Sequence, residues 1–398
     1  MDDEQTSLWT AEFGWIIVAH LLNGLGYASM VLLPLYLHEL GASRTDIGVI
    51  MATASVAGLL FRPVVGFGLD RFGRKPIMYL ATSLIGLAFF LFLAIDEIGP
   101  LLYFDRAIFG IAEGALFSAN FAFAADIIPA PKRTQGIAIF GVAGLTALLV
   151  NPLSDALQIA PKDLRYFFPV VGIVVCSSMI PLLFIQERVS TAPTHRPNWR
   201  ELPTALTHHR LWSVWLASII FASLVSTFFA FAAVTAASRN LATPSSLWLT
   251  YVFGAVVVRL GGGHLPDRYG THNFMAPSLA FYVAGALVLA SVQSAEGFAL
   301  AGLLSGIAHG ACFPILTSQV ISRSPEAFRG SALAFYTGLW GLSALVSKPL
   351  MGQIADRHGD DTMFLTLSAL SIIGLALWAL IEHFQGGPKE PSANSTPA

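Results

Sequence analysis

Two ionisable residues lie in the middle of long apolar runs, where they are the first candidates for chemistry in this sequence. Glu113 lies in the run 100–125 and His309 in the run 296–321. A carboxyl group and an imidazole can each bind and release a proton, and burial changes how readily they do so. An ionisable side chain in a membrane-spanning helix is costly, so it is expected to face the inside of a bundle or a water-filled path. We therefore expect Glu113 to be a proton-coupling group, with His309 as a second protonatable or substrate-contacting group.

Five further polar residues in the apolar runs are expected to line the same cavity: Arg106, His20, Asn23, Tyr27 and Lys348. Arg106 precedes Glu113 by seven residues, which places both on one helix face. The spacing of His20, Asn23 and Tyr27 is i, i+3, i+7 and predicts one polar stripe. Lys348 lies toward the outer end of the run 330–353.

Each of these residues also has a purely structural interpretation, which the sequence leaves open. Glu113 and Arg106 would then form a static ion pair between helices. His309 would be a packing histidine beside small residues, and the polar stripe would hold helices together.

The composition excludes an ordinary soluble domain. Hydrophobic residues make up 55% of the 398 residues and charged residues 12%, with a mean hydropathy of +0.67. Soluble proteins carry about twice that share of charge, at about 25%. The net charge of −2 provides no electrostatic footprint for nucleic acid. The sequence therefore predicts a multi-span membrane protein.

Twelve apolar runs are long enough to cross a bilayer. They cover residues 11–37, 46–66, 76–95, 100–125, 136–157, 166–186, 212–237, 246–263, 273–292, 296–321, 330–353 and 362–383. The predicted fold is an all-α integral membrane protein with twelve transmembrane helices in two six-helix repeats. The predicted segments are an N-terminal stretch 1–10, a bundle 11–186, a linker 187–211, a bundle 212–384 and a disordered tail 385–398.

The distribution of Lys and Arg predicts the orientation of the chain. With the N-terminus inside, the inner segments hold thirteen of the 22 Lys and Arg residues and the outer segments hold five. Positive charge favours the cytoplasmic side. Both termini and the linker are therefore expected in the cytoplasm, with the protein in a bacterial inner membrane.

The two halves of the chain are related in sequence. Gly110–Phe117 aligns with Gly306–Phe313 at an offset of 196, which pairs Glu113 with His309. Arg62 and Arg259 correspond at an offset of 197. These arginines are expected at matched inner ends of two spans, either extended to the interface or acting in gating. Two parallel repeats with a site between them near the membrane midplane are a known transporter arrangement.

A glycine-rich, charged loop joins the second and third runs. It reads Gly66-Phe67-Gly68-Leu69-Asp70-Arg71-Phe72-Gly73-Arg74-Lys75, with a weaker copy at 263–270. The pattern G-x-x-x-D-R-x-G-R-K resembles the signature loop of the major facilitator superfamily, over roughly residues 11–385.

The resemblance implies a latch that closes the cytoplasmic side. Its residues would be Gly66, Asp70, Arg71, Gly73, Arg74, Asp126, Asp267 and Arg268. Asp70 would lie against the start of the eleventh span near Gly330, and Arg74 would pair with Asp126. The alternative is a solvated loop that fixes topology. In the second copy Thr271 and His272 replace the basic pair, which puts a latch there in doubt.

The predicted function is secondary active transport of a small organic solute by alternating access. Proton-coupled efflux is favoured because Leu33-Pro34-Leu35-Tyr36-Leu37 and the signature loop resemble the efflux branch. Uptake by proton symport of an organic anion or zwitterion is the alternative. It is favoured by the basic cavity and by the fifth span, where 150–155 lacks the glycine-rich element of antiporters.

A non-transporting membrane sensor or assembly partner is the alternative from another class. The sequence contains no phosphate loop, nucleophile elbow or spaced metal-ligand cluster. We therefore expect no enzyme activity, no cofactor and no metal, with a small molecule, protons and the bilayer as partners of a monomer.

Overall fold

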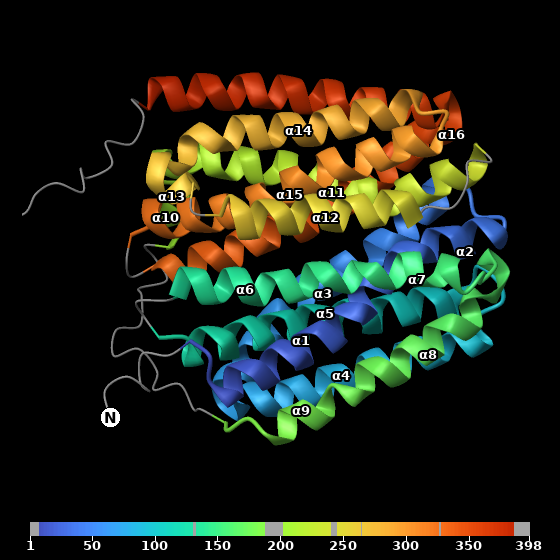
Figure 1. Ribbon diagram of the computed structural model, residues 1–398, viewed down its shortest axis with the longest axis horizontal. Helices are drawn as coiled ribbons and strands as arrows, with labels where there is room; N and C mark the ends of the chain where they lie inside the picture. Colours follow the sequence, from blue (N-terminus) through green and yellow to red (C-terminus); the bar gives the residue numbers. More distant parts are fainter. Residues whose placement is uncertain are drawn as a thin grey trace, which may run out of the picture.

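The computed structural model describes residues 8–129, 133–187, 202–239, 245–263, 265–325 and 328–385. Within these ranges the chain is helical, without a strand. An apolar chain in lipid must satisfy every backbone N–H and C=O internally, which an α-helix does. In Figure 1 the first half of the chain, blue to green, lies below the second half, yellow to red.

The helices follow the predicted runs in order. The first half contains α1 (Ala11–Ser29), α2 (Leu33–Glu39), α3 (Arg44–Phe72), α4 (Arg74–Leu91), α5 (Pro100–Ile127), α6 (Arg133–Thr146), α7 (Val150–Ala156), α8 (Leu164–Ser177) and α9 (Met179–Leu183). The second half contains α10 (Leu202–Leu206), α11 (Trp212–Ser238), α12 (Ser245–Gly261), α13 (Leu265–Tyr269), α14 (Thr271–Ser291), α15 (Ala295–Arg323) and α16 (Arg329–Phe384).

The number of membrane spans agrees with the sequence. Ten helices in the described part are long and apolar enough to cross a membrane. One of them, Ser331–Phe384, has 54 residues and is interrupted at Gly359, whose φ is 86°, so it supplies two spans. The shorter apolar helix Ser245–Gly261 supplies one more. The prediction of an all-α fold with twelve spans is confirmed.

The predicted segment limits stay a prediction. Residues 1–7, 188–201 and 386–398, which include most of the expected N-terminal stretch, linker and tail, lie outside the described residues. The described end of the linker contains the short helix α10.

The helix ends define two sides of the molecule. The short helices α10 and α13 lie at one end of the bundle, where α16 also ends with Gln385 hydrogen-bonded to His209, and we call this end the linker side. The end of α11, the start of α3 and the break at Gly359 lie together at the opposite end, since Ser238 and Arg44 both contact Asp360, and we call this end the far side. The linker side is at the left of Figure 1 and the far side at the right.

Glycine-rich joints occur at the same place in both halves. Gly73 joins α3 to α4 with a φ of 89°, and Gly270 joins α13 to α14 with a φ of 87°. This left-handed region is open to glycine at little cost but strained for other residues. The loop therefore needs its glycine in both copies, although the second copy has lost the basic pair.

Two further glycines bring spans into close contact at equivalent places. A Cβ atom at Gly110 of α5 would overlap the carbonyl oxygen of Ala54 in α3. A Cβ atom at Gly306 of α15 would overlap the carbonyl oxygen of Tyr251 in α12. The same close helix packing therefore occurs in both halves, and Glu113 and His309 each lie three residues after the close contact.

Replacing Gly110 by alanine is expected to destabilise the protein, because the added methyl group meets backbone that cannot move aside. Overpacking of this kind costs about 1–3 kcal/mol. The measurement is thermal unfolding of the purified protein in detergent. Gly14→Ala is the control, because a Cβ atom at Gly14 meets nothing within 4 Å. Equal unfolding temperatures for the two variants would contradict the close approach of α3 and α5.

Candidate functional site

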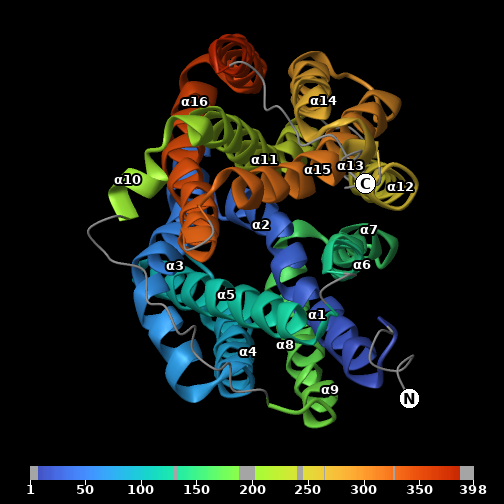
Figure 2. The same cartoon turned by 90° about the vertical axis from the view of Figure 1, so that its left-hand side faces the viewer.

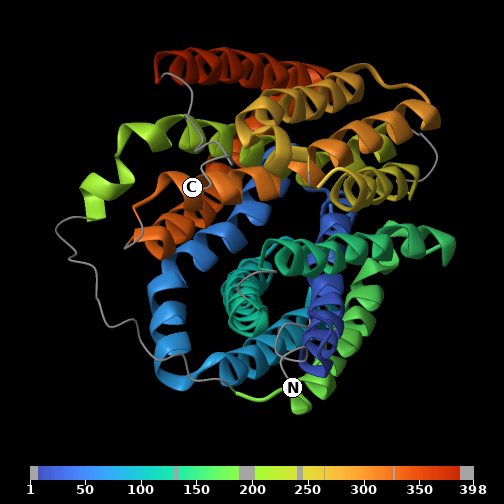
Figure 3. The same cartoon turned by 60° about the vertical axis from the view of Figure 1, so that its left-hand side comes forward.

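A cavity of about 370 Å³ lies between the two halves. It is lined from both sides, by helices that surround the centre of the molecule in Figures 2 and 3. The structure brings all of the predicted proton-coupling and cavity residues to this one cavity: His20, Asn23, Tyr27, Arg106, Glu113, His309 and Lys348. Their roles stay a prediction. Because the residues come together from separate spans, this cavity is the place where those roles would be carried out.

Glu113 lies midway along α5, and its carboxylate has no direct hydrogen bond or ion pair among the described residues. The cationic groups whose charges act on it are Arg62 of α3 and Lys348 of α16. The alternative interpretation, a static ion pair between Glu113 and Arg106, is therefore wrong. The carboxylate of Glu113 therefore lies in the cavity under the influence of positive charges from both halves, but it forms no direct bond with any described residue.

Arg106 is neutralised by a different partner, the neighbouring Asp105. Arg106 Nη2 and Nε lie 2.7 and 2.9 Å from Asp105 Oδ2, and both side chains are buried. The guanidinium also lies 4.7 Å from the ring centroid of Phe109 and 5.4 Å from that of Phe92. The sequence analysis missed Asp105, although an acid within the run 100–125 was a sufficient signal. Residues i and i+1 are not neighbours on a helix face, so their pairing was not expected.

His309 is held at the centre of α15 by an aromatic shell. Its Nδ1 lies 2.5 Å from the hydroxyl oxygen of Tyr251, which lies 3.5 Å from that of Tyr282. The ring packs edge-on against Phe221, with centroids 5.3 Å apart. The imidazole is thus anchored in the second half on one side, while it lines the cavity on the other.

The three residues of the polar stripe on α1 all line the cavity, but they differ in their contacts. His20 stacks on Phe140 with ring centroids 4.0 Å apart. Asn23 Oδ1 accepts a hydrogen bond from Ser178 Oγ at 2.5 Å. Tyr27 is 42% exposed, so it is the member of the stripe most available to a solute.

Arg62 and Arg259 also line the cavity. The sequence analysis did not include them among the expected cavity residues. Arg62 donates to Thr337 Oγ1 at 2.5 Å and to the Thr337 carbonyl oxygen at 2.8 Å. Arg259 lies beside Gly141 of α6, where a Cβ atom would overlap its guanidinium. Each arginine thus reaches from one half to the other and lines the cavity. Of the two alternatives, extension to the interface does not describe these contacts, and a role in gating stays a prediction; the repetition of the arginines at one offset was the available signal.

The signature loop shows one of the two contacts that the resemblance implies. Arg74 Nε lies 3.2 Å from Asp126 Oδ2. The carboxylate of Glu187 also caps the start of α4, accepting from the backbone N–H groups of Arg74 and Lys75 at 2.9 and 2.7 Å.

The structure describes fewer contacts for the other residues of the expected latch. The side chains of Asp70 and Asp267 lie outside the described residues, so the contact of Asp70 near Gly330 is not described. Arg71 and Arg268 are exposed and lie beside their neighbours Phe72 and Tyr269. The role of the loop as a latch stays a prediction.

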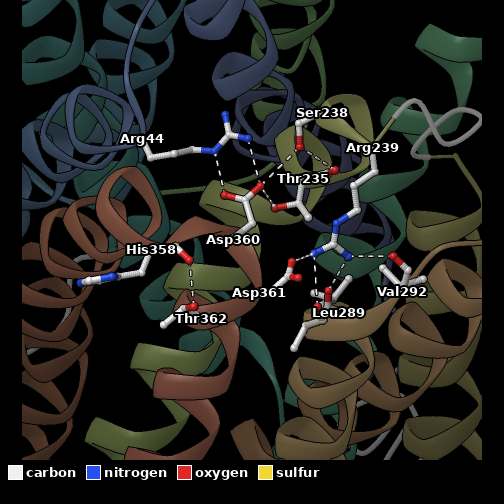
Figure 4. A network of polar contacts seen from close by, with 11 residues as sticks. Arg44, Thr235, Ser238, Arg239, Leu289, Val292, His358, Asp360, Asp361 and Thr362 are labelled. Carbon is white, nitrogen blue, oxygen red and sulfur yellow. Dashed lines mark hydrogen bonds and ion pairs between the residues drawn. The ribbon is translucent and has the colours of Figure 1, made fainter.

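On the far side, the two halves are joined by charged groups (Figure 4). Arg44 Nε and Nη2 each donate to the carboxylate of Asp360 at 3.0 Å. Asp356 accepts from the backbone N–H groups of Arg44 and Thr45 at 2.7 Å each, at the start of α3. An acid at a helix N-terminus is favourable.

Within the described part of the chain, the hydrogen bonds between the halves gather toward the far side. Among the described residues, the hydrogen bonds between halves nearest to the linker side are those of Arg62 with α16. The described part of the molecule is therefore closed by polar contacts on the far side.

Comparison with known proteins identifies the wider group. The family model described as Major Facilitator Superfamily matches residues 16–347. An uncharacterized MFS-type transporter, STM4428 of Salmonella typhimurium strain LT2, is 24% identical over 88% of this chain and 91% of its own length. The multidrug resistance protein MdtG of Escherichia coli strain SMS-3-5 is 24% identical over 89% of this chain and 91% of its own length.

Solved structures share the fold. The human organic anion transporter MFSD10 has a TM-score of 0.70 at 18% identity, covering 92% of this chain and 99% of its own. The nucleoside transporter NupG has a TM-score of 0.73 at 13% identity, covering 94% and 99%. At these identities the likeness concerns the fold alone.

Replacing Asp360 by asparagine is expected to loosen the far side, because hydrogen bonds to a charged group contribute about 1.5–3 kcal/mol. The measurement is the distance distribution between spin labels at the exposed positions Glu97 and Gln293, one in each half. It should gain a population at longer distances. Asp361→Asn is the control, because Asp361 pairs with Arg239 within the second half. An unchanged distribution in Asp360→Asn would show that this pair does not hold the halves together.

Proposed function

We propose that this chain, which belongs to the major facilitator superfamily, moves a small organic solute across the membrane by alternating access, with the central cavity as its solute site and Glu113 as its proton site. Its family makes it a multi-span membrane transporter and not an enzyme. We also propose that transport is coupled to protons and that the protein acts as a monomer.

The observation that carries the proposal is the unpartnered carboxylate of Glu113 in a cavity between two halves. A carboxylate with strong fixed partners stays ionised, whereas one without a direct partner responds to water and to charge that enter its site. The charges of Arg62, in the first half, and Lys348, in the second half, act on Glu113. A change in the spacing of the halves would therefore change its proton occupancy.

The far-side contacts support a cycle with two arrangements of the halves. In the structure Arg44 and Asp360 join the halves on the far side. Alternating access would require these contacts to separate while the signature loop closes the linker side. Such a change is rigid-body rocking of two repeats around a fixed site.

Export is the first candidate direction, with protons moving the opposite way. It is supported by relatives named multidrug resistance protein at 24% identity. With the linker side in the cytoplasm, as the Lys and Arg distribution predicts, the cavity would receive solute from inside the cell. The bacterial relatives favour the inner membrane as the location.

Uptake by proton symport of an organic anion is the second candidate, favoured by the charge of the cavity. Arg62, Arg259 and Lys348 line it together with one carboxylate that lacks a direct partner, Glu113. An anion and a proton on Glu113 would assist each other, because the proton removes the repulsion between the two negative charges.

The Glu113→Gln variant is expected to remove the pH dependence of transport while the protein still folds, because glutamine keeps the shape of the side chain but cannot ionise. The measurement compares small-molecule profiles of cells and medium, at several pH values, for strains expressing the wild type, the variant or neither. Glu97→Gln, at an exposed far-side position, should behave as the wild type. A folded Glu113→Gln protein with the wild-type profile and pH response would exclude Glu113 as the proton site.

The two directions predict opposite effects of pH on solute binding. If a proton on Glu113 competes with the solute, as in export by exchange, the dissociation constant should rise as the pH falls. If the proton assists an anion, as in symport, it should fall as the pH falls. Binding of the solute identified by the profiles, measured calorimetrically at a series of pH values, decides between them. A dissociation constant independent of pH would contradict both.

A further inference from the structure

Four cationic side chains line the cavity, and the structure compensates them unequally: Arg62, Arg106, Arg259 and Lys348. Arg106 is neutralised by Asp105. Arg62 donates to both oxygen atoms of Thr337. The ammonium group of Lys348 lies 3.4 Å from the Met51 carbonyl oxygen and acts on Glu113. Arg259 is the cation for which such compensation is missing within the described part of the chain.

Arg259 is poorly satisfied for a side chain in an apolar bundle. Its Nε is buried and has no hydrogen-bond partner, and no carboxylate of a described residue pairs with it. Its guanidinium lies 5.9 Å from the ring centroid of Phe313 and beside Gly141 across the cavity. Arg259 is half-buried where it lines the cavity, and a guanidinium in an apolar bundle without an anion is costly. The site is therefore incomplete until an acceptor with negative charge enters.

An aromatic wall adjoins this guanidinium. The rings of Phe313 and Trp340 meet edge to face with centroids 5.8 Å apart. The rings of His309 and Phe229 lie 6.3 Å apart and continue the wall. All four residues line the cavity. Edge-to-face and stacked contacts with such rings favour a flat aromatic group in the solute.

We propose that Arg259 binds the carboxylate of an aromatic organic acid whose ring lies against Phe313 and Trp340. The planar guanidinium matches a carboxylate with two parallel hydrogen bonds. Gly141, by lacking a side chain, leaves the room that the guanidinium occupies. This inference rests on the proposed role of the cavity as the solute site, and it does not depend on the direction of transport.

The test uses three probes of one shape and different charge: 2-naphthoate, 2-naphthamide and 2-naphthylmethylammonium. Their affinities for the purified full-length protein are measured from the concentration dependence of thermal unfolding, since a ligand of the folded state raises the unfolding temperature. Naphthoate should bind at least about tenfold more tightly than the other two, as charge-assisted hydrogen bonds imply. An amide or ammonium probe that binds as tightly, or no binding by naphthoate, overturns the inference.

Two variants assign the effect to Arg259. Arg259→Gln should weaken naphthoate binding about tenfold or more while leaving naphthamide binding unchanged. Gly141→Ala keeps the charge but displaces the guanidinium, whose flexible end can move aside. It should weaken naphthoate binding several-fold at an unchanged unfolding temperature. Arg357→Gln, an exposed far-side change, is the control. Full naphthoate affinity in both cavity variants would overturn the assignment to Arg259.

The outcomes separate this inference from the proposed function. If the ammonium probe binds more tightly and loses affinity in Glu113→Gln, the cavity remains the solute site while the anion subsite is excluded. If wild-type and empty strains give identical small-molecule profiles, transport itself fails, whatever the probes show.

Discussion

The structure depends on how an apolar helix bundle accommodates buried charge. A charge removed from water must be paired, hydrogen-bonded or left where water and ligands can reach it. This chain uses all three arrangements around one cavity. Asp105 and Arg106 neutralise each other, Arg62 bonds to Thr337, and Glu113 and Arg259 have no direct charged partner within the described part. Glu113 and Arg259 both line the cavity between the halves, where we propose that a proton and a solute bind them.

The repeat explains why these groups meet. The close contacts of Gly110 with Ala54 and of Gly306 with Tyr251 are equivalent, so each half builds the same packing between neighbouring spans. The proposed function depends on positions at which the two repeats differ. Glu113 in one half is matched by His309 in the other, which gives the cavity a carboxylate on one wall and an imidazole anchored by Tyr251 on the opposite wall. A strictly symmetric pair of walls would have no such difference in charge.

The sequence predicts local features well and contacts between the halves poorly. Apolar length predicts the spans, and helical spacing predicts that His20, Asn23 and Tyr27 share one face of the cavity. Helical spacing also placed Arg106 and Glu113 on one face and left an ion pair between them open, but the Arg106 guanidinium pairs with Asp105 instead. The bond between Arg44 and Asp360 joins residues 316 positions apart. The residue pattern within one helix cannot predict a contact between distant parts of the chain. For the same reason it did not predict that Arg259 lies beside Gly141.

The central claim is that Glu113 changes its protonation state during function. Infrared difference spectroscopy of the protein in lipid, recorded as the pH is changed, detects the C=O stretch of a protonated carboxyl group directly. The account predicts a carboxyl band that appears and disappears reversibly with pH in the wild type and is missing from Glu113→Gln. A wild-type spectrum identical to that of Glu113→Gln throughout the pH range in which transport responds would contradict it.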